Sequence, residues 1–181
     1  LKEKPVLMVY LADCHESLAG IIAGRLKERY YKPVIVAAKS GGLIKCSGRS
    51  VEGYNMFAEL SAIKENFEHF GGHPMAAGVS FKAEKFKLIQ NELIKRCTLT
   101  EEDLTEKVYI DVPMKTDDIT PYFMEQLDLM EPFGTGNKRA LFAEKEVRIL
   151  GLRIFGKNRN VIKLKLKNPS GNVFDGIYFG A

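Results

Sequence analysis

Ser47-Gly48-Arg49-Ser50 is a tetrapeptide whose residue types suit the binding of an anion. Its glycine lets the backbone approach a ligand, its two hydroxyl groups can form hydrogen bonds, and its guanidinium can hold a phosphate group through two parallel hydrogen bonds. A polar turn at the end of a strand uses the same residue types, so both interpretations stay open for these four residues alone. We predict that Ser47, Gly48, Arg49 and Ser50 contribute to a phosphate-binding site.

A second motif, GGHPMAAG at residues 71–78, places one histidine among small residues that cannot fill a core. A flexible turn of this composition brings backbone N–H groups and an imidazole against a flat or charged ligand. The alternative is a tight turn around a hydrogen-bonded core histidine, because small residues also permit close packing of helices and strands. We predict that Gly71, Gly72, His73 and Ala76 contribute to a ligand site.

Asp13-Cys14-His15-Glu16 contains residue types that bind metal ions, but at consecutive positions. Neighbouring residues of a strand or loop rarely point at one ion, and a structural metal site needs about four convergent ligands. The segment is more typical of a helix cap. His69 and His73 are the only other histidines and the carboxylates are scattered, so we predict no metal site and no catalytic nucleophile paired with a base.

Residues 153–167 carry six basic side chains and no aspartate or glutamate. Lysines alternate with apolar residues at the end of this segment, so a strand there has lysines on one face and apolar residues on the other. The lysine side would follow a phosphate backbone, with Lys163 and Lys165 as contacts, whereas a solvated edge strand protected by lysine is the alternative. Tyr178 and Phe179 could supply a stacking platform, although one of the two must face the core.

The N-terminal half has the pattern of an α/β domain. Continuous apolar runs at 6–12 and 33–38 predict two buried strands, and the amphipathic segment 18–30 between them predicts a crossover helix that Ser17 caps. The two strands are then parallel. We further expect helical stretches over most of 55–70, a strand at 76–81 and an amphipathic helix at 85–97.

The polar, acidic segment 99–107 has no apolar stripe and reads as a linker. A chain of 181 residues can hold one large domain or two small ones, and we predict two, at 1–98 and 108–181.

The second domain begins with an alternating strand at 108–114, followed by a helix that Thr120 caps and Pro121 starts and that ends before Pro132. From Ala140 onward the pattern is β. Turn residues separate the segments 141–150, 151–156, 160–167 and 172–180, which predicts a barrel or a meander. We expect the chain to end before the last strands of such a barrel.

The composition is that of a globular protein. Hydrophobic residues make up 45% and charged residues 28%, which excludes a disordered tail or a fibre, and the net charge of +4 is too mild to identify a partner. Cys14, Cys46 and Cys97 lie far apart without CxxC spacing, which favours the reducing cytoplasm. No apolar run approaches the roughly 18 to 20 residues needed to cross a bilayer, so we expect no membrane partner.

Four motifs follow one another along the chain: HESLAGIIAGRLKERYYKPVIV, SGRS, FGGHPMAAG and LMEPFGTGN. In this order and spacing they resemble the RecJ family over nearly the whole sequence. SGRS followed by FGGHPMAAG is similar to the DHHA1 domain that follows DHH phosphoesterase domains, and EPFGTGN is similar to the adjoining OB-fold domain. The resemblance implies an α/β DHHA1 domain with a mixed sheet and flanking helices, followed by a mostly β, OB-fold-like partial barrel.

The resemblance also implies a 5′-to-3′ exonuclease of single-stranded DNA used in recombination and repair. The family binds manganese or magnesium in its DHH domain, and this sequence has no DHH motif. We therefore expect no cofactor and no catalytic residue here, and no cleavage by this chain alone. Ser47 and Arg49 resemble the groups that meet the DNA end or its phosphates, with Gly72 and His73 in the same cleft. Single-stranded DNA is the expected partner, with a single-strand-binding protein or a helicase as further candidates.

Cys14 departs from the family, which often has tryptophan before the histidine of the first motif, and a packing or stacking ring is thereby lost. Two other functions stay open. A DHH-family phosphodiesterase of short oligonucleotides or cyclic dinucleotides has a similar glycine-histidine motif, but it lacks the OB-fold that EPFGTGN indicates. A non-enzymatic docking module for nucleic acid or protein would use the basic strand and keep the glycine motif as a turn.

Overall fold

The computed structural model describes residues 4–179. The chain forms two compact units, residues 1–107 and residues 108–181. In the described part of the chain, no helix has both the length and the hydrophobicity to cross a bilayer.

The first unit is an α/β fold around a five-stranded mixed sheet of order β1-β2-β3-β5-β4. β1 and β2 run parallel and α1 connects them, while the other neighbouring strands are antiparallel. The α/β fold class and the strand–helix–strand opening are therefore confirmed. The elements are β1 (Leu7–Leu11), α1 (Ala19–Tyr30), β2 (Val34–Ser40), β3 (Leu43–Arg49), α2 (Met56–Ser61), β4 (His69–His73), β5 (Ala76–Phe81) and α3 (Phe86–Arg96).

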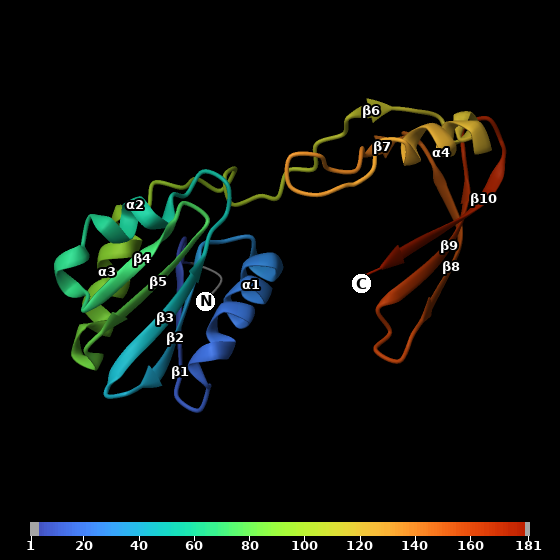
Figure 1. The fold of residues 1–181 in the computed structure, drawn as a ribbon. Coiled ribbons are helices and arrows are strands. Elements are labelled where there is room, and N and C mark those ends of the chain that lie inside the picture. The colour runs from blue at the N-terminus through green and yellow to red at the C-terminus, as the bar shows by residue number, and fades with distance from the viewer. Residues whose placement is uncertain (1–3, 180–181) are drawn as a thin grey trace. The chain divides into compact units, whose positions relative to one another are not determined.

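Helices cover both sides of this sheet, with α1 on one side and α2 and α3 on the other (Figure 1). On the α1 side, Ala19 and Ala23 pack against Val34 and Val36 of β2, because two small side chains on one helix face permit a close approach. The larger apolar cluster lies on the opposite side. Its buried members include Ile35, Ile44, Cys46, Met56, Leu60, Val79, Phe81, Ile89 and Leu93.

Two local predictions in the first unit are wrong. Ser17 does not cap the long helix, since a 3-10 turn at Glu16–Leu18 precedes α1 and the Ser17 backbone N–H donates to Nδ1 of His15 at 3.3 Å. Residues 69 and 70 lie in the stretch 55–70 that we expect to be mostly helical, but they begin β4, because every residue of 69–73 pairs in register with β5. The first half of the glycine-histidine motif is therefore strand, and its turn lies at residues 74–75.

The second unit is mostly antiparallel β, as its predicted fold class requires. β8, β9 and β10 form a meander, and β6 pairs with β7 in a separate parallel pair. The described strands do not close into a barrel. The elements are β6 (Val112–Pro113), α4 (Pro121–Asp128), β7 (Phe142–Ala143), β8 (Arg148–Phe155), β9 (Val161–Lys167) and β10 (Val173–Phe179).

The predicted boundaries in this unit are partly confirmed. Oγ1 of Thr120 accepts the backbone N–H of Phe123 at 3.1 Å, and Pro121 is the first residue of α4, as expected. The strand expected at 108–114 is only the two-residue β6. The segments expected at 141–150 and 151–156 instead yield β7 and one continuous strand, β8, because a β-bulge between Ile149 and Gly151 lets the strand pass through the glycine.

Candidate nucleic-acid interface

Strand register brings the two predicted motifs of the first unit onto one side of the sheet. Directly opposed residues of an antiparallel pair point to the same side. We call the resulting surface the β3–β5–β4 face. Its first row is Arg49, Ala76 and His73, and its second row is Ser47, Gly78 and Gly71.

The β3–β5–β4 face lies on the α1 side of the sheet and has an open floor. Arg49 and Ser47 pair with Val34 and Val36, the β2 residues on which α1 packs. A Cβ on Gly71 would meet no atom within 4 Å, and one on Gly78 would come no closer than 3.8 Å to a backbone oxygen. A flat or extended ligand can therefore approach the strand backbone here.

Arg49 is half-buried and held by its own strand. Its Nη1 donates to Oγ of Ser47 at 3.0 Å and to the carbonyl oxygen of Gly48 at 2.8 Å. A guanidinium has five N–H groups, so donors other than those on Nη1 stay available for an anion. Within residues 4–179, Arg49 forms no ion pair.

Gly20 of α1 borders the candidate surface, and sequence reasoning did not connect it with Arg49 and Ser47. A Cβ on Gly20 would sit 2.9 Å from Nη2 of Arg49 and 3.2 Å from Oγ of Ser47, so the helix leaves room for both side chains only because this position is glycine. The sequence does hold a signal, because a glycine inside an amphipathic helix destabilises that helix by about 1 kcal/mol relative to alanine. Its presence there indicates a requirement for space.

His73 lies on the edge strand β4 with an exposed side chain. Its Nδ1 accepts the backbone N–H of Met75 at 3.3 Å. A neutral imidazole in this arrangement carries its proton on Nε2, which can donate to an oxygen of a ligand.

Lys45 lies farther along β3 on the same side but is already paired. Its Nζ is 2.9 Å from Oε2 of Glu16. A hydrogen bond from Ser40, followed by the hydrogen bond and charge of Lys45, holds the pKa of the Glu16 carboxyl below its usual value. Of these two β3 cations, Arg49 is therefore the unpaired one beside the glycine floor.

Three predicted site residues do not point to this face. Gly48 and Gly72 lie on the opposite side of the sheet because side chains alternate along a strand. A Cβ on Gly48 would be 3.2 Å from Sδ of Met56, and one on Gly72 would be 2.4 Å from the Ala76 carbonyl oxygen. Ser50 is 2% exposed and donates to the carbonyl oxygen of Tyr54 at 2.6 Å. These three residues contribute to the packing and hydrogen bonding of the fold and lie outside the β3–β5–β4 face.

A second surface, which we call the lysine face, lies on one side of the β8–β9–β10 sheet. Register places four rows of side chains on it. They are Arg148, Lys167 and Val173, then Gly151, Lys165 and Asp175, then Arg153, Lys163 and Ile177, and finally Phe155, Val161 and Phe179. The alternating exposure of residues 163–167 agrees with lysines outside and leucines inside.

Lys163, predicted to contact a phosphate backbone, is already paired with Asp175. Oδ2 of Asp175 lies 2.8 Å from Nζ of Lys163, and the hydrogen bond and charge of that lysine hold the pKa of the Asp175 carboxyl below its usual value. Residues 153–167 contain no acidic side chain, so the partner was visible only through the pairing of β9 with β10. Among the described residues, Lys165, Lys167, Arg148 and Arg153 form no ion pair.

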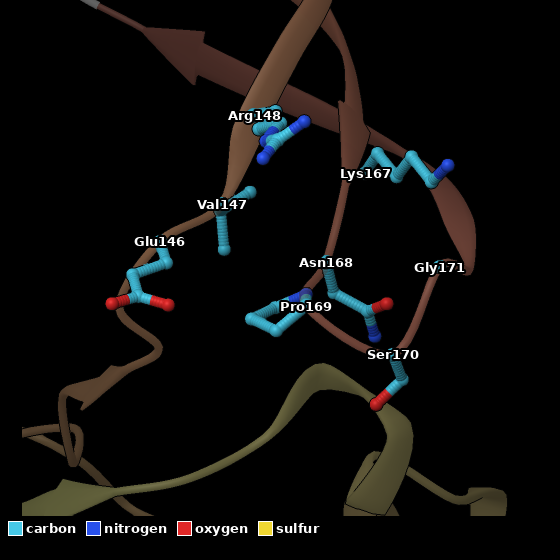
Figure 2. A pocket seen from close by; sticks show the side chains of 8 residues that line it. All are labelled: Glu146, Val147, Arg148, Lys167, Asn168, Pro169, Ser170 and Gly171. Atoms are coloured by element: carbon cyan, nitrogen blue, oxygen red, sulfur yellow. The ribbon is translucent and has the colours of Figure 1, made fainter.

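A hollow of about 620 Å³ opens where the lysine face meets the β9–β10 turn. Figure 2 shows Arg148 and Lys167 on neighbouring strands above the turn formed by residues 168–171. Asn168 is 4% exposed, and Asp117 fixes the turn because its Oδ1 accepts from the side-chain amides of Asn168 and Asn172, both at 2.7 Å. The hollow is thus lined by the cations Arg148 and Lys167 and by the carboxylate of Glu146, beside a polar turn held by hydrogen bonds (Figure 2).

Metal-binding side chains do not cluster in the part of the chain that the structure describes. In residues 4–179, no three histidine, cysteine, aspartate or glutamate side chains come together in a way that could hold a metal ion. The Asp13–Glu16 segment instead leads into the 3-10 turn before α1.

Comparisons with known proteins agree with this two-unit architecture. The DHHA1 domain model matches residues 3–98 and the RecJ OB domain model matches residues 110–181. The chain is 32% identical to the single-stranded-DNA-specific exonuclease RecJ of Bacillus subtilis over 94% of this chain and 22% of that protein. It is 33% identical to RecJ of Haemophilus influenzae over 98% of this chain and 32% of that protein.

Among solved structures, RecJ in complex with Mn²⁺ from Thermus thermophilus has a similar fold, with a TM-score of 0.70 and 21% sequence identity. The match covers 98% of this chain and 30% of that one. The sequence therefore spans less than a third of the length of these relatives and structures. By both of its domain matches, the chain belongs to the RecJ family and comprises the DHHA1 and OB domains of that family.

Proposed function

We propose that this chain holds single-stranded DNA for 5′-to-3′ exonuclease cleavage by a catalytic domain outside the sequence. The proposal is supported by relatives named as single-stranded-DNA-specific exonucleases, of which the chain covers 22% and 32%. It is also supported by the lack of a metal-binding cluster among residues 4–179, because phosphodiester hydrolysis often uses two metal ions. The cutting step and its manganese or magnesium ions then belong to the DHH domain of the complete protein.

The observation that carries this proposal is the register that aligns Arg49 with Ala76 and His73. Arg49 and Ser47 offer charged and neutral donors for phosphate oxygens, and Nε2 of His73 offers another from the sheet edge. The floor at Gly71 has no side chain to keep a nucleotide away from the backbone. Together these groups suit the sugar-phosphate backbone at the end of a DNA single strand.

The lysine face extends the proposal to a longer stretch of DNA. Its unpaired cations give sequence-independent attraction to phosphates, and such binding weakens as counterions compete. We expect the logarithm of affinity to fall with the logarithm of salt concentration by about 0.7 for each phosphate contacted.

The cellular setting follows from the same role. A unit that holds single-stranded DNA for an exonuclease of repair and recombination would act in the cytoplasm. It would work beside proteins that expose or coat single-stranded DNA. A single-strand-binding protein or a helicase is therefore a candidate partner of the complete protein.

The test measures binding and cleavage separately. Fluorescence anisotropy with labelled single-stranded oligonucleotides should show weak, salt-dependent binding, and Arg49→Ala should reduce affinity about tenfold because a charge-assisted hydrogen bond is lost. Arg25→Ala is a matched control, since Arg25 is an exposed arginine of α1 paired with Glu28. Manganese should release no nucleotides. Release that survives repurification and disappears in Arg49→Ala would place catalysis in this chain and overturn the proposal.

Oligonucleotide length separates this function from the alternatives. Stronger binding to ten or more nucleotides than to dinucleotides supports a RecJ-type role, whereas the reverse supports a phosphodiesterase of very short substrates. If Arg49→Ala and His73→Ala left affinity unchanged while charge reversal at Lys163 and Lys165 abolished it, the first unit would not be a substrate site. A docking module would then be the better description.

A further inference from the structure

The row of the lysine face nearest the β8–β9 connection is aromatic and apolar instead of basic. Phe155 pairs with Val161, and Val161 pairs with Phe179, so both rings project from the side of the sheet that carries the lysines. Tyr178 pairs with Ile162 and lies on the other side. The stacking platform expected at Tyr178 and Phe179 is therefore split, and Phe155 takes the place of the tyrosine.

Both phenylalanine rings are open to solvent. Phe155 is 45% exposed and Phe179 is 72% exposed. In the described part of the chain, neither ring stacks on another aromatic ring. The same sheet also exposes Leu152 and Ile177, so the feature that points to a ligand is the pair of rings beside a cationic surface and not exposure alone.

We propose that Phe155 and Phe179 stack on bases of a single strand whose phosphates lie along Lys165, Lys167, Arg148 and Arg153. The inference rests on the proposed function and adds base contacts to phosphate contacts. Aromatic rings next to a basic groove are the general means of binding single strands without sequence preference, since every base has a π face. A duplex offers no such contact, because its bases are already stacked and paired.

The spacing of the two rings sets how many nucleotides lie between them. Phe155 and Phe179 stand on strands separated by β9, so their Cα atoms are roughly 10 Å apart, twice the spacing between neighbouring strands. Bases in a stacked strand follow at about 3.4 Å, so a span of roughly 10 Å corresponds to about three steps. The platform therefore holds bases about three steps apart, with Val161 as its floor.

The charges on the lysine face suit a DNA single strand that stacks on the two rings. Asp175 is the one acidic residue among the four rows, and it pairs with Lys163 in the row adjacent to the rings. The cations without a carboxylate partner lie at Arg153 beside the rings and farther away at Lys165, Lys167 and Arg148. A DNA single strand would thus meet rings at one end of the face and cations without a carboxylate partner along the rest of it.

The test separates the contribution of the two rings to affinity from that of the charges. Phe155→Leu and Phe179→Leu together keep apolar volume but remove the π faces, and we expect affinity for an oligothymidylate of about 15 nucleotides to fall about tenfold or more. The slope of affinity against salt should not change. An abasic oligonucleotide of the same length should bind the wild-type chain and the double variant equally, and more weakly than the oligothymidylate binds the wild type.

Tyr178→Leu is the matched control, because Tyr178 is an aromatic residue 54% exposed on the other side of the sheet. Its effect should be small, and circular dichroism should show that all variants are folded. If the double variant bound oligothymidylate like the wild type, or if the abasic strand bound the wild type equally well, the stacking inference would be overturned. In that case, a continued effect of Arg49→Ala would leave the proposed function standing. Absence of any single-strand binding by the wild type would overturn both.

Discussion

The two units hold their candidate surfaces by different means. In the described residues, every buried apolar side chain lies between Val6 and Leu93, whereas the buried residue of the second unit is the polar Asn168. The first unit carries its candidate surface on a sheet that is fixed by a packed core. The second unit presents an exposed surface on a strand ladder whose turn is held by hydrogen bonds to Asp117. One candidate surface is therefore preorganised by packing and the other mainly by backbone pairing.

Core truncation gives the largest expected contrast between the units. Phe81 is fully buried, and Phe81→Ala should lower the free energy of unfolding of the first unit by about 3–5 kcal/mol through lost transfer energy and a cavity. Leu164→Ala, at a half-buried position of β9, should lower that of the second unit by only about 1 kcal/mol. Urea unfolding followed through amide NMR signals of each unit measures both. Equal losses would contradict the proposed difference in packing.

Gly72→Ala tests how the core fixes the β3–β5–β4 face. Its φ is +151°, and a Cβ there would be 2.5 Å from Cα of Ala77, so the variant should lose about 2–3 kcal/mol of unfolding free energy. Gly71→Ala is the control on the neighbouring residue. Its Cβ would meet nothing within 4 Å, so its stability should barely change while its affinity for single strands falls, because the open floor is occupied. Thermal unfolding and anisotropy provide the two measurements, and the reverse pattern would mean that the faces are assigned wrongly.

The sequence predicted most of the first unit because its patterns are local. Apolar runs identified β1 and β2, and amphipathic periodicity identified α1 and α3. Residues 69–73 were missed because HFGGH has no strand signature of its own, and only pairing with β5 makes it a strand. In the same way, motif chemistry pointed to Arg49 and His73, but it could not tell which glycines share their side of the sheet. Gly71 and Gly78 lie on the β3–β5–β4 face, while Gly48 and Gly72 face the core.

Gly20→Ala should separate folding from binding in the first unit. The added Cβ would be 2.9 Å from Nη2 of Arg49, which is the end of a flexible side chain, so the arginine should move while the fold survives. We expect affinity for single strands to fall about fivefold, roughly the effect of a weakened charge-assisted hydrogen bond, with unfolding free energy equal or higher because alanine favours the helix. Gly24→Ala meets no atom within 4 Å and should gain stability without losing affinity. If Gly20→Ala and Gly24→Ala bound single-stranded DNA with equal affinity, Arg49 would not contribute to binding.

The smallest expected effect concerns the second unit, where a surface charge and not packing sets the contact. Asp175→Asn removes the carboxylate partner of Lys163, and affinity for single strands should rise about two- to threefold at low salt, since exposed ion pairs are weak and phosphate attraction is screened. Asp118→Asn changes the net charge equally but lies outside the lysine face, so it should have a smaller effect. Because the second unit has no buried apolar core to disturb among its described residues, neither change should alter unfolding much. Titration by anisotropy at two salt concentrations would decide the matter, and equal affinities of the two variants would mean that only overall charge attracts the strand.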